Sequence, residues 1–216
     1  MDNTVGSRRN LTQVHRDVIV GSILGDGCME RNGRYVRLKI GHGLKQQDYV
    51  RWKSKLLKPL CAHQPRFVKG VIHRKTGIRY SRIEVSTFSL PVFEEYWQKF
   101  YVNGRKQIPE DMEKLLIEPL ALAIWFMDDG YKRNDCSALR ISTDSFSYED
   151  QKILQLCLIK NFDISTRIHR KGKFWNIYIP SAQASKFCEL IKPYIIPSMN
   201  YKISFDPVTT DPERVR

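Results

Sequence analysis

Two apolar segments of the same length, each ending in Asp-Gly, limit what this chain can fold into more than any other feature of its sequence. They are IVGSILGDG at 19–27 and LAIWFMDDG at 122–130. A helix that is apolar nearly all round has to be buried against another element. Small residues let two helix backbones approach closely, and both segments carry them: Gly21, Ser22, Gly25, Ala121 and Ala123. We therefore predict that the two helices pack against each other.

Packing of the two helices would bring Asp26 and Asp129 together at their carboxyl ends. The helix dipole disfavours anions at that end, and the two carboxylates repel each other. Divalent cations bound between the acids offset this cost and supply the Lewis acid and metal-bound water that phosphodiester hydrolysis needs. A single helix that ends in Asp-Gly is weak evidence for a site, because glycine commonly terminates helices. Two of them in a basic chain favour a site for two or more Mg²⁺ ions, with Mn²⁺ as a substitute.

The charge of the chain indicates a polyanionic partner. There are 36 Lys and Arg residues against 23 Asp and Glu, which gives a net charge of +13 and a pI near 9.6. The excess is concentrated, because the stretch from Arg31 to Arg82 contains fifteen basic residues and a single acid, Asp48. Ordinary solvated surfaces mix both signs. This distribution favours a nucleic-acid face, and a role in solubility alone is the alternative.

The chain consists of two repeats of one pattern. In each repeat an apolar helix is followed by a strand pair, a helix, a second strand pair and a closing helix. We therefore expect an N-terminal repeat at 1–104, a linker with a short helix at 105–119 and a C-terminal repeat at 120–216. The strands are predicted from period-two alternation. In 35–40, for example, apolar residues alternate with Tyr35, Arg37 and Lys39.

The outward rows of these strands suit a twisted antiparallel sheet that lies in the major groove of double-stranded DNA. Arg and Lys can reach guanine edges and phosphates there, and Asn can pair with adenine. Glu84 also falls on an outward row. The residues that we predict to contact DNA are Arg34, Arg37, Lys39, Arg74, Lys75, Arg82, Arg167, His169, Arg170, Asn176 and Tyr178. Any single row could equally be plain solvent-facing sheet.

Both Asp-Gly segments resemble the LAGLIDADG signature. The chain is similar to single-chain homing endonucleases that carry two such motifs, most of all to the type encoded by the mitochondrial omega intron. The similarity includes KQIP at 106–109, AIWFMDDG at 123–130, STDSFSYED at 142–150 and IKPYIIPSMNYK at 191–202. It covers most of the chain and is densest after residue 95.

The resemblance implies an α+β fold of two pseudo-symmetric αββαββα repeats, whose antiparallel sheets form a DNA-binding saddle around a central two-helix interface. It implies a monomeric, Mg²⁺-dependent endonuclease that cuts both strands of a long asymmetric target across the minor groove and leaves short 3′ overhangs. Asp26 and Asp129 match the catalytic, metal-binding acids, with the carbonyls of Gly25 and Asp128 as further metal ligands.

Lys106 and Lys202 match a lysine that this family places near each active site, so the resemblance makes both of them catalytic candidates. A cation there can stabilise developing charge or organise the attacking water. The alternative is an ordinary lysine that contacts phosphate or solvent.

The two motifs differ in ways that bear on the site. The first has Leu-Gly at 24–25 where the second has Met-Asp at 127–128, so the two active sites need not be equivalent. The family often carries a polar residue at the strand end after the first helix, and no clear counterpart exists here. His42 and Thr143 occupy the matched positions, and His42 is a candidate for positioning water.

Two other classes of function stay open. A family member that has lost cleavage would act as an intron maturase or a DNA-binding protein, although retention of both acids and both lysines argues against it. An unrelated basic RNA-binding domain would need an exposed aromatic platform. The sequence lacks such a motif, and this class leaves the duplicated helix unexplained.

The remaining features predict an intracellular globular protein without membrane association. The five cysteines are widely spaced and contain no C-x-x-C pair, so we expect reduced packing residues. The longest strongly apolar run, 119–127, is far too short to span a bilayer, and the amino terminus lacks the apolar core of a secretion signal. The sequence does not distinguish a bacterial cytoplasm from an organelle.

Overall fold

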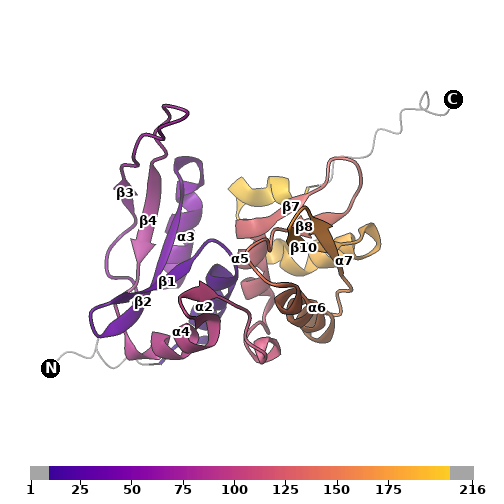
Figure 1. Cartoon of the computed structure of the whole chain (residues 1–216), viewed down its shortest axis with the longest axis horizontal. Coiled ribbons are helices and arrows are strands. Elements are labelled where there is room, and N and C mark those ends of the chain that lie inside the picture. Colours follow the sequence, from indigo (N-terminus) through magenta and orange to yellow (C-terminus); the bar gives the residue numbers. More distant parts are fainter. Residues whose placement is uncertain (1–9, 205–216) are drawn as a thin grey trace.

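The computed structural model describes residues 10–204, which form two halves on either side of a central pair of helices (Figure 1). The central helices are α2 (Gln13–Leu24) and α5 (Pro119–Asp129). Helix α2 begins after Thr12, whose hydroxyl accepts a hydrogen bond from the backbone N–H of His15 at 3.2 Å. Helix α5 begins at Pro119, because the fixed φ and missing N–H of proline suit the first helical turn.

The first half places a four-stranded antiparallel sheet beside helices α3 (Gln47–Leu56) and α4 (Glu94–Phe100). Its strand order is β1-β2-β4-β3, and short 3-10 turns η1 (Leu44–Gln46) and η2 (Pro91–Phe93) precede the two helices. The strands are β1 (Cys28–Asn32), β2 (Tyr35–Gly43), β3 (Arg66–Val68) and β4 (Arg82–Ser86). The loop between β3 and β4 projects beyond the rest of this half (Figure 1).

The second half repeats this plan with helices α6 (Tyr148–Phe162) and α7 (Ser181–Ile191). Its antiparallel sheet has the order β7-β8-β10-β9, which matches the order of the first sheet position by position. The strands are β7 (Gly130–Lys132), β8 (Leu139–Ile141), β9 (Arg167–Lys171) and β10 (Phe174–Ile179). The fold is therefore α+β with two αββαββα repeats, as the sequence predicts.

Short elements complete the chain between and after the repeats. The hairpin of β5 (Tyr101–Val102) and β6 (Arg105–Lys106) is followed by η3 (Met112–Lys114), and the described chain closes with η4 (Lys192–Tyr194) and η5 (Pro197–Lys202). Among residues 10–204, no helix has both the length and the apolar character that a membrane crossing requires.

The central helices pack against each other as closely as the sequence predicts. A Cβ atom built on Gly21 would lie 2.5 Å from the carbonyl oxygen of Ala121, and one on Gly25 would lie 2.4 Å from Cβ of Asp128. Ala121 and Trp125 of α5 are fully buried. Since protein interiors are close-packed, any side chain at either glycine would push the two helices apart.

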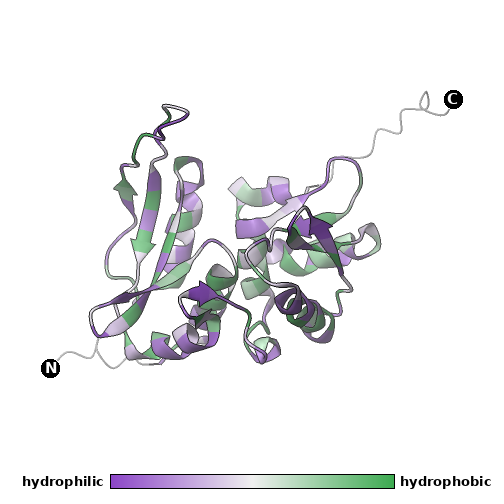
Figure 2. Cartoon of the chain, viewed as in Figure 1, coloured by the Kyte–Doolittle hydropathy of each residue, from purple (hydrophilic) through white to green (hydrophobic). Residues whose placement is uncertain are grey.

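The predicted alternation holds along β2, where Val36, Leu38 and Ile40 are buried. Figure 2 shows hydrophobic and hydrophilic residues alternating along β4 as well. Two outward positions differ from the expectation of open polar side chains, because Glu84 is 3% exposed and Asn176 is 1% exposed. Basic side chains cover Glu84 through ion pairs, whereas the Oδ1 atom of Asn176 is buried without a hydrogen-bond partner among the described residues.

Candidate active site between the two halves

Three acidic residues meet where the central helices end. Helix α2 stops at Leu24 and is capped by Gly25, so Asp26 follows in the next bend, and Asp128 and Asp129 are the last two residues of α5. Burial, then the charge of Asp26, then that of Asp128 raise the pKa of Asp129 to about 7. Mutually repelling carboxylates in a partly buried site are stabilised by cations. The charge of Asp26 thus acts on Asp129, in line with the expectation that the two helix ends lie together.

Two lysines bind the backbone at these helix ends, one for each motif. Nζ of Lys106, in β6, donates to the carbonyl oxygens of Gly25 and Gly27 at 3.0 Å each. Nζ of Lys202, at the end of η5, donates to the carbonyl oxygen of Met127 at 2.6 Å and to that of Asp128 at 3.2 Å. Burial lowers the pKa of both lysines, and the nearby acids oppose this shift. Both catalytic candidates thus lie at the meeting point of the acids.

The carboxylate of Asp128 has a partner that sequence reasoning missed. Nζ of Lys53, in α3, lies 2.7 Å from Oδ1 and 3.0 Å from Oδ2 of Asp128. Both side chains are fully buried. The signal in the sequence is the inward stripe of α3, on which Lys53 lies with the buried residues Tyr49, Val50 and Ser54. A lysine on such a stripe needs a buried anion.

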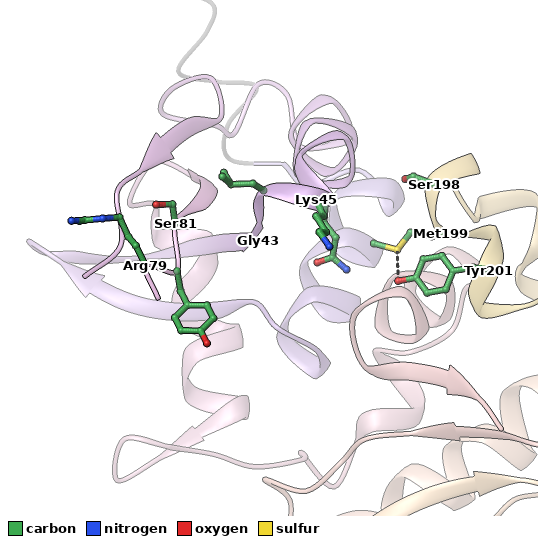
Figure 3. Close-up of a pocket in the computed structure, with 10 residues that line it drawn as sticks. Gly43, Lys45, Arg79, Ser81, Ser198, Met199 and Tyr201 are labelled. Carbon is green, nitrogen blue, oxygen red and sulfur yellow. Dashed lines mark hydrogen bonds between the residues drawn. The ribbon is translucent and has the colours of Figure 1, made fainter. Parts of the chain in front are cut away.

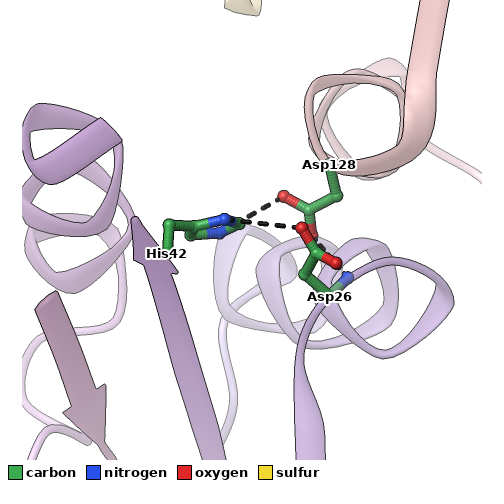
Figure 4. Close-up of side chains that lie close together, drawn as sticks. All are labelled: Asp26, His42 and Asp128. Carbon is green, nitrogen blue, oxygen red and sulfur yellow. Dashed lines mark hydrogen bonds and ion pairs between the residues drawn. The ribbon is translucent and has the colours of Figure 1, made fainter. Parts of the chain in front are cut away.

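His42 lies between these groups, and its side chain faces Asp26 and Asp128 (Figure 4). Its Nδ1 is 3.5 Å from Oδ2 of Asp26, and its Nε2 is 3.6 Å from Oδ1 of Asp128. Burial and then the charge of Lys53 lower the pKa of His42, which keeps the ring neutral. Because Lys53 can only donate to Nε2, at 3.4 Å, the ring proton belongs on Nδ1, toward Asp26.

The matched position in the second half has different chemistry. Thr143 is 1% exposed, and its hydroxyl donates to Oε1 of Gln151 at 2.7 Å. Gln151 in turn donates to the carbonyl oxygen of Thr143 at 2.9 Å. The Thr143 hydroxyl also lies 3.5 Å from the carbonyl oxygen of Trp175. These partners are all uncharged, whereas His42 faces two acids. The expected inequivalence of the two motifs thus extends to their surroundings.

The donor set at this site suits a hard divalent cation. The carboxylate of Asp26 is half exposed, and single ligand atoms of Asp26, His42 and Asp128 lie within 4.8 Å of one another. Of these three, Asp128 is already neutralised by Lys53. The oxygen atoms of Asp26, Asp129 and the carbonyl of Gly25 are therefore the better candidates, because Mg²⁺ prefers oxygen ligands.

Several predicted DNA contacts of the first half are paired with acids in this structure. Nε of Arg37 donates to Glu30 at 2.8 Å. Glu84 accepts from Arg82 at 3.0 Å and lies 3.8 Å from Nζ of Lys39. These side chains share one face of the sheet, as predicted. Contact with DNA would exchange ion pairs within the sheet for contacts with phosphates or bases.

The projecting loop of the first half carries both basic and apolar side chains on its surface. Arg74 and Lys75 are exposed, and so are Val71 and Tyr80. Arg34 is also exposed, and its guanidinium lies 5.3 Å from the centroid of the Tyr35 ring. The predicted contacts Arg34, Arg74 and Lys75 are thus accessible to a partner.

The outer face of the second sheet is only partly as predicted. Arg167 and Arg170 are exposed, and the rings of His169 and Tyr178 stack with centroids 4.3 Å apart. The expectation of an open Asn176 side chain is wrong for this structure, because this residue is only 1% exposed.

An open groove of about 610 Å³ lies next to the acidic centre and is lined by both halves (Figure 3). Gly43, Lys45 and Arg79 line it from the first half, and Ser198 and Tyr201 line it from the second. Gly43 directly follows His42, and Tyr201 directly precedes Lys202. The groove therefore gives a large partner access to the residues beside the acids.

Comparisons with known proteins agree with this geometry. The sequence profile described as the LAGLIDADG DNA endonuclease family matches residues 16–187. The chain is 32% identical over 193 residues to the cytochrome b mRNA maturase bI2 of Debaryomyces hansenii. The aligned region covers 87% of this chain and 72% of the relative. It is 31% identical over 211 residues to the DNA endonuclease I-ChuI of Chlamydomonas applanata, which covers 90% and 96% respectively.

A solved structure shares the fold. It is that of the homing endonuclease I-WcaI bound to its DNA recognition sequence, which matches with a TM-score of 0.84 over 95% of this chain and 94% of that chain, at 24% identity. Together with the sequence profile and the relatives, it places both repeats in one known architecture. The chain belongs to the LAGLIDADG DNA endonuclease family.

Proposed function

We propose that this chain is a site-specific endonuclease that hydrolyses both strands of a long asymmetric DNA target and leaves short 3′ overhangs. The observation that carries the proposal is the meeting of Asp26 and Asp129 at the ends of α2 and α5, with a lysine bound to each motif. A relative named as a DNA endonuclease and a solved homing endonuclease bound to its recognition sequence support duplex DNA as the substrate.

In this proposal Mg²⁺ ions would be held between the halves by the carboxylates of Asp26 and Asp129 and by the carbonyl oxygens of Gly25 and Asp128. The raised pKa of Asp129 supports this, because a carboxylate that is costly to ionise alone gains from a cation. When bound, Mg²⁺ supplies Lewis acidity and an acidic water. Lys106 and Lys202 hold the two carbonyls and add positive charge where the phosphate becomes more negative.

We assign DNA recognition to the outward faces of the two sheets, with the first half contributing most of the positive charge. In this proposal residues 1–104 and 120–216 are the two repeats, joined by the linker at 105–119, and one chain binds one asymmetric site as a monomer. Basic side chains outside the acidic centre position the duplex by its phosphates. The specific kinship to the omega-intron enzyme stays a prediction.

The test is cleavage of the intron-less version of the chain's own insertion locus by purified protein. In Mg²⁺ we expect one double-strand cut with short 3′ overhangs, mapped by sequencing both ends, and in Ca²⁺ we expect binding without cutting. Mn²⁺ is expected to replace Mg²⁺. Tight and specific binding with no cut in either active metal would contradict the proposal.

A cleavage-deficient maturase or DNA-binding protein is the second candidate, because a relative 32% identical to this chain is named as a cytochrome b mRNA maturase. Measuring both splicing of the host intron and cleavage of the insertion locus distinguishes the maturase from the endonuclease. Splicing of the host intron in the presence of the protein, combined with an uncut insertion locus, would favour the maturase. Retention of Asp26, Asp129, Lys106 and Lys202 favours the endonuclease.

A further inference from the structure

A buried ion pair links the two halves immediately behind the acidic centre. Lys53 belongs to α3 of the first half, and Asp128 belongs to α5 of the second. Nζ of Lys53 contacts both carboxylate oxygens of Asp128, at 2.7 and 3.0 Å, and neither side chain is exposed to solvent. Nζ also lies 4.3 Å from the centroid of the Tyr49 ring, whose face attracts cations.

Stability alone is a poor reason for such a pair. Taking two charges out of water costs several kcal/mol each, and apolar residues of similar size are often as stable or more so. Stability therefore does not by itself account for this pair. The position of Asp128, one residue before Asp129, suggests a task in the site instead.

The pair acts directly on the backbone of Asp26. Oδ2 of Asp128 accepts the backbone N–H of Asp26 at 3.1 Å. Asp26 follows the C-cap of α2, and the backbone N–H of Gly25 bonds instead to Gly21 within the helix. The carboxylate of Asp128 thus ties the bend that carries Asp26 to the opposite half, and Lys53 fixes that carboxylate.

Only the second motif has a carboxylate at this position, and the reason is steric. Gly25 is the counterpart of Asp128 in the first motif, and a Cβ atom on Gly25 would lie 2.4 Å from Cβ and 2.5 Å from Oδ2 of Asp128. Only one of the two motifs can therefore carry a side chain at this position. In the second half, Thr143 and Gln151 hydrogen-bond to each other instead.

We propose that Lys53 and Asp128 form a positioning pair that sets the backbone of Asp26 for cleavage and keeps the Asp128 carboxylate away from metal coordination. The proposal rests on the proposed function and assigns Lys53 a role in it. Lys53 neutralises the carboxylate of Asp128, and this carboxylate accepts the backbone N–H of Asp26. The main-chain carbonyl of Asp128, which accepts from Lys202 at 3.2 Å, is then the part of this residue that can still face a metal.

The test uses two double variants that both remove the buried charges. In Lys53→Met/Asp128→Asn, the amide oxygen of the asparagine can still accept the N–H of Asp26. In Lys53→Met/Asp128→Leu, no acceptor is left. Neither variant contains an unpaired buried charge, so both are expected to fold, with unfolding temperatures measured by circular dichroism. The single variant Lys53→Met leaves Asp128 unpaired and serves as the third arm.

Cleavage is followed at saturating Mg²⁺ on a duplex with each strand labelled separately. Lys53→Met and the leucine double variant should cut one strand about 10- to 100-fold more slowly, the usual effect of losing a group that orients a metal ligand. The asparagine double variant should recover to within a few-fold of the parent. Parental rates in the leucine double variant, or no recovery in the asparagine one, would overturn the proposal.

Amide hydrogen exchange at Asp26 gives a readout that does not depend on cleavage. The N–H of Asp26 should exchange faster in the leucine double variant than in the asparagine one, while the amides within α2 keep their protection. If the parent chain proves to cut no DNA, this comparison still decides the role of the pair. Equal protection of Asp26 in both double variants would show that Asp128 does not hold this backbone.

Discussion

Nζ of Lys106 lies 3.0 Å from the backbone carbonyl oxygen of Gly25, so the start of the linker is bound to the Asp-Gly motif of the first repeat. Lys202 makes the equivalent contact with Asp128 in the second repeat, at 3.2 Å. The structure thus gives each motif its own lysine, although the two motifs differ in sequence.

Replacing Lys106 or Lys202 by Ala should slow cutting more than it weakens DNA binding, and each change should chiefly affect one strand. The reason is that each lysine contacts the carbonyls of a single motif. A plasmid assay should then accumulate the nicked form. Lys45→Ala is the matched control, because this exposed lysine lines the groove and should affect binding rather than the cut. Equal loss of both cuts in the Lys106 and Lys202 variants would refute the assignment.

Replacing Arg37, Lys39 or Arg82 by Ala should weaken recognition mainly at base pairs on one side of the target, because all three lie on the first sheet. A good contact between a side chain and a base pair is worth about 1–3 kcal/mol of discrimination. The measurement is a binding profile across a library of single-base variants. A uniform loss at every position would mean that these side chains touch only phosphate.

DNA affinity should fall steeply with salt. A net charge of +13, concentrated in the first half, implies many phosphate contacts, and each contact on duplex DNA releases about 0.9 counterion. A plot of log affinity against log salt concentration should therefore have a slope of several units. A nearly flat plot would show that the basic stretch serves solubility instead of DNA binding.

Much of the fold could be predicted because it depends on local patterns. The apolar segments at 19–27 and 122–130 have no polar face, so both had to be buried. Gly21 permits the close approach of the two helices that the structure shows. The alternation in β2 likewise separates a core face from a basic face. These features depend on periodicity, which a sequence displays directly.

Contacts between distant residues were harder to predict. The interaction of Lys53 with Asp128 joins residues far apart in the chain, and the sequence offered only an out-of-place lysine on the inward stripe of α3. The burial of Glu84 and Asn176 was missed because alternation gives the face of a sheet on which a residue lies, but not what covers it. His42 was left open for the same reason, since only the structure shows that it faces Asp26.

Asp17 should make the protein less stable as the pH rises. This carboxyl is 3% exposed in α2, and burial, with a contribution from Glu118, raises its pKa to about 6. The folded state therefore holds the proton more strongly than the unfolded state, so the stability that this group contributes below about pH 4 is lost as the pH approaches and passes 6. Asp17→Asn should raise the free energy of unfolding at pH 8 by about 1–2 kcal/mol, and the gain should vanish near pH 4.

The free energies of unfolding are measured by urea unfolding at high and low pH. Asp111→Asn is the control, because its effect on stability at high pH should have the opposite sign to that of Asp17→Asn. A hydrogen bond from Lys99 lowers the pKa of Asp111, so its contribution is present above its unfolded pKa and is lost as the pH falls through the folded value. This variant should be less stable than the parent at pH 8, and the difference should shrink as the pH falls below the unfolded pKa of Asp111. A gain for both variants at pH 8 would indicate a general charge effect instead.

Asp26→Asn and Asp129→Asn should separate binding from cleavage. Asparagine keeps the shape of the side chain and removes one of several adjacent anions, so folding should be unharmed or slightly stabilised. Either change should lower the cutting rate by orders of magnitude at Mg²⁺ levels that saturate the parent, because the site loses charge that the metal needs. DNA affinity in Ca²⁺ should stay within a few-fold of the parent, because the phosphate and groove contacts are made elsewhere. Asp111→Asn, an acid paired with Lys99 outside this site, should cut at the parental rate. Near-parental cleavage by both Asp26→Asn and Asp129→Asn would show that the two acids do not carry the reaction.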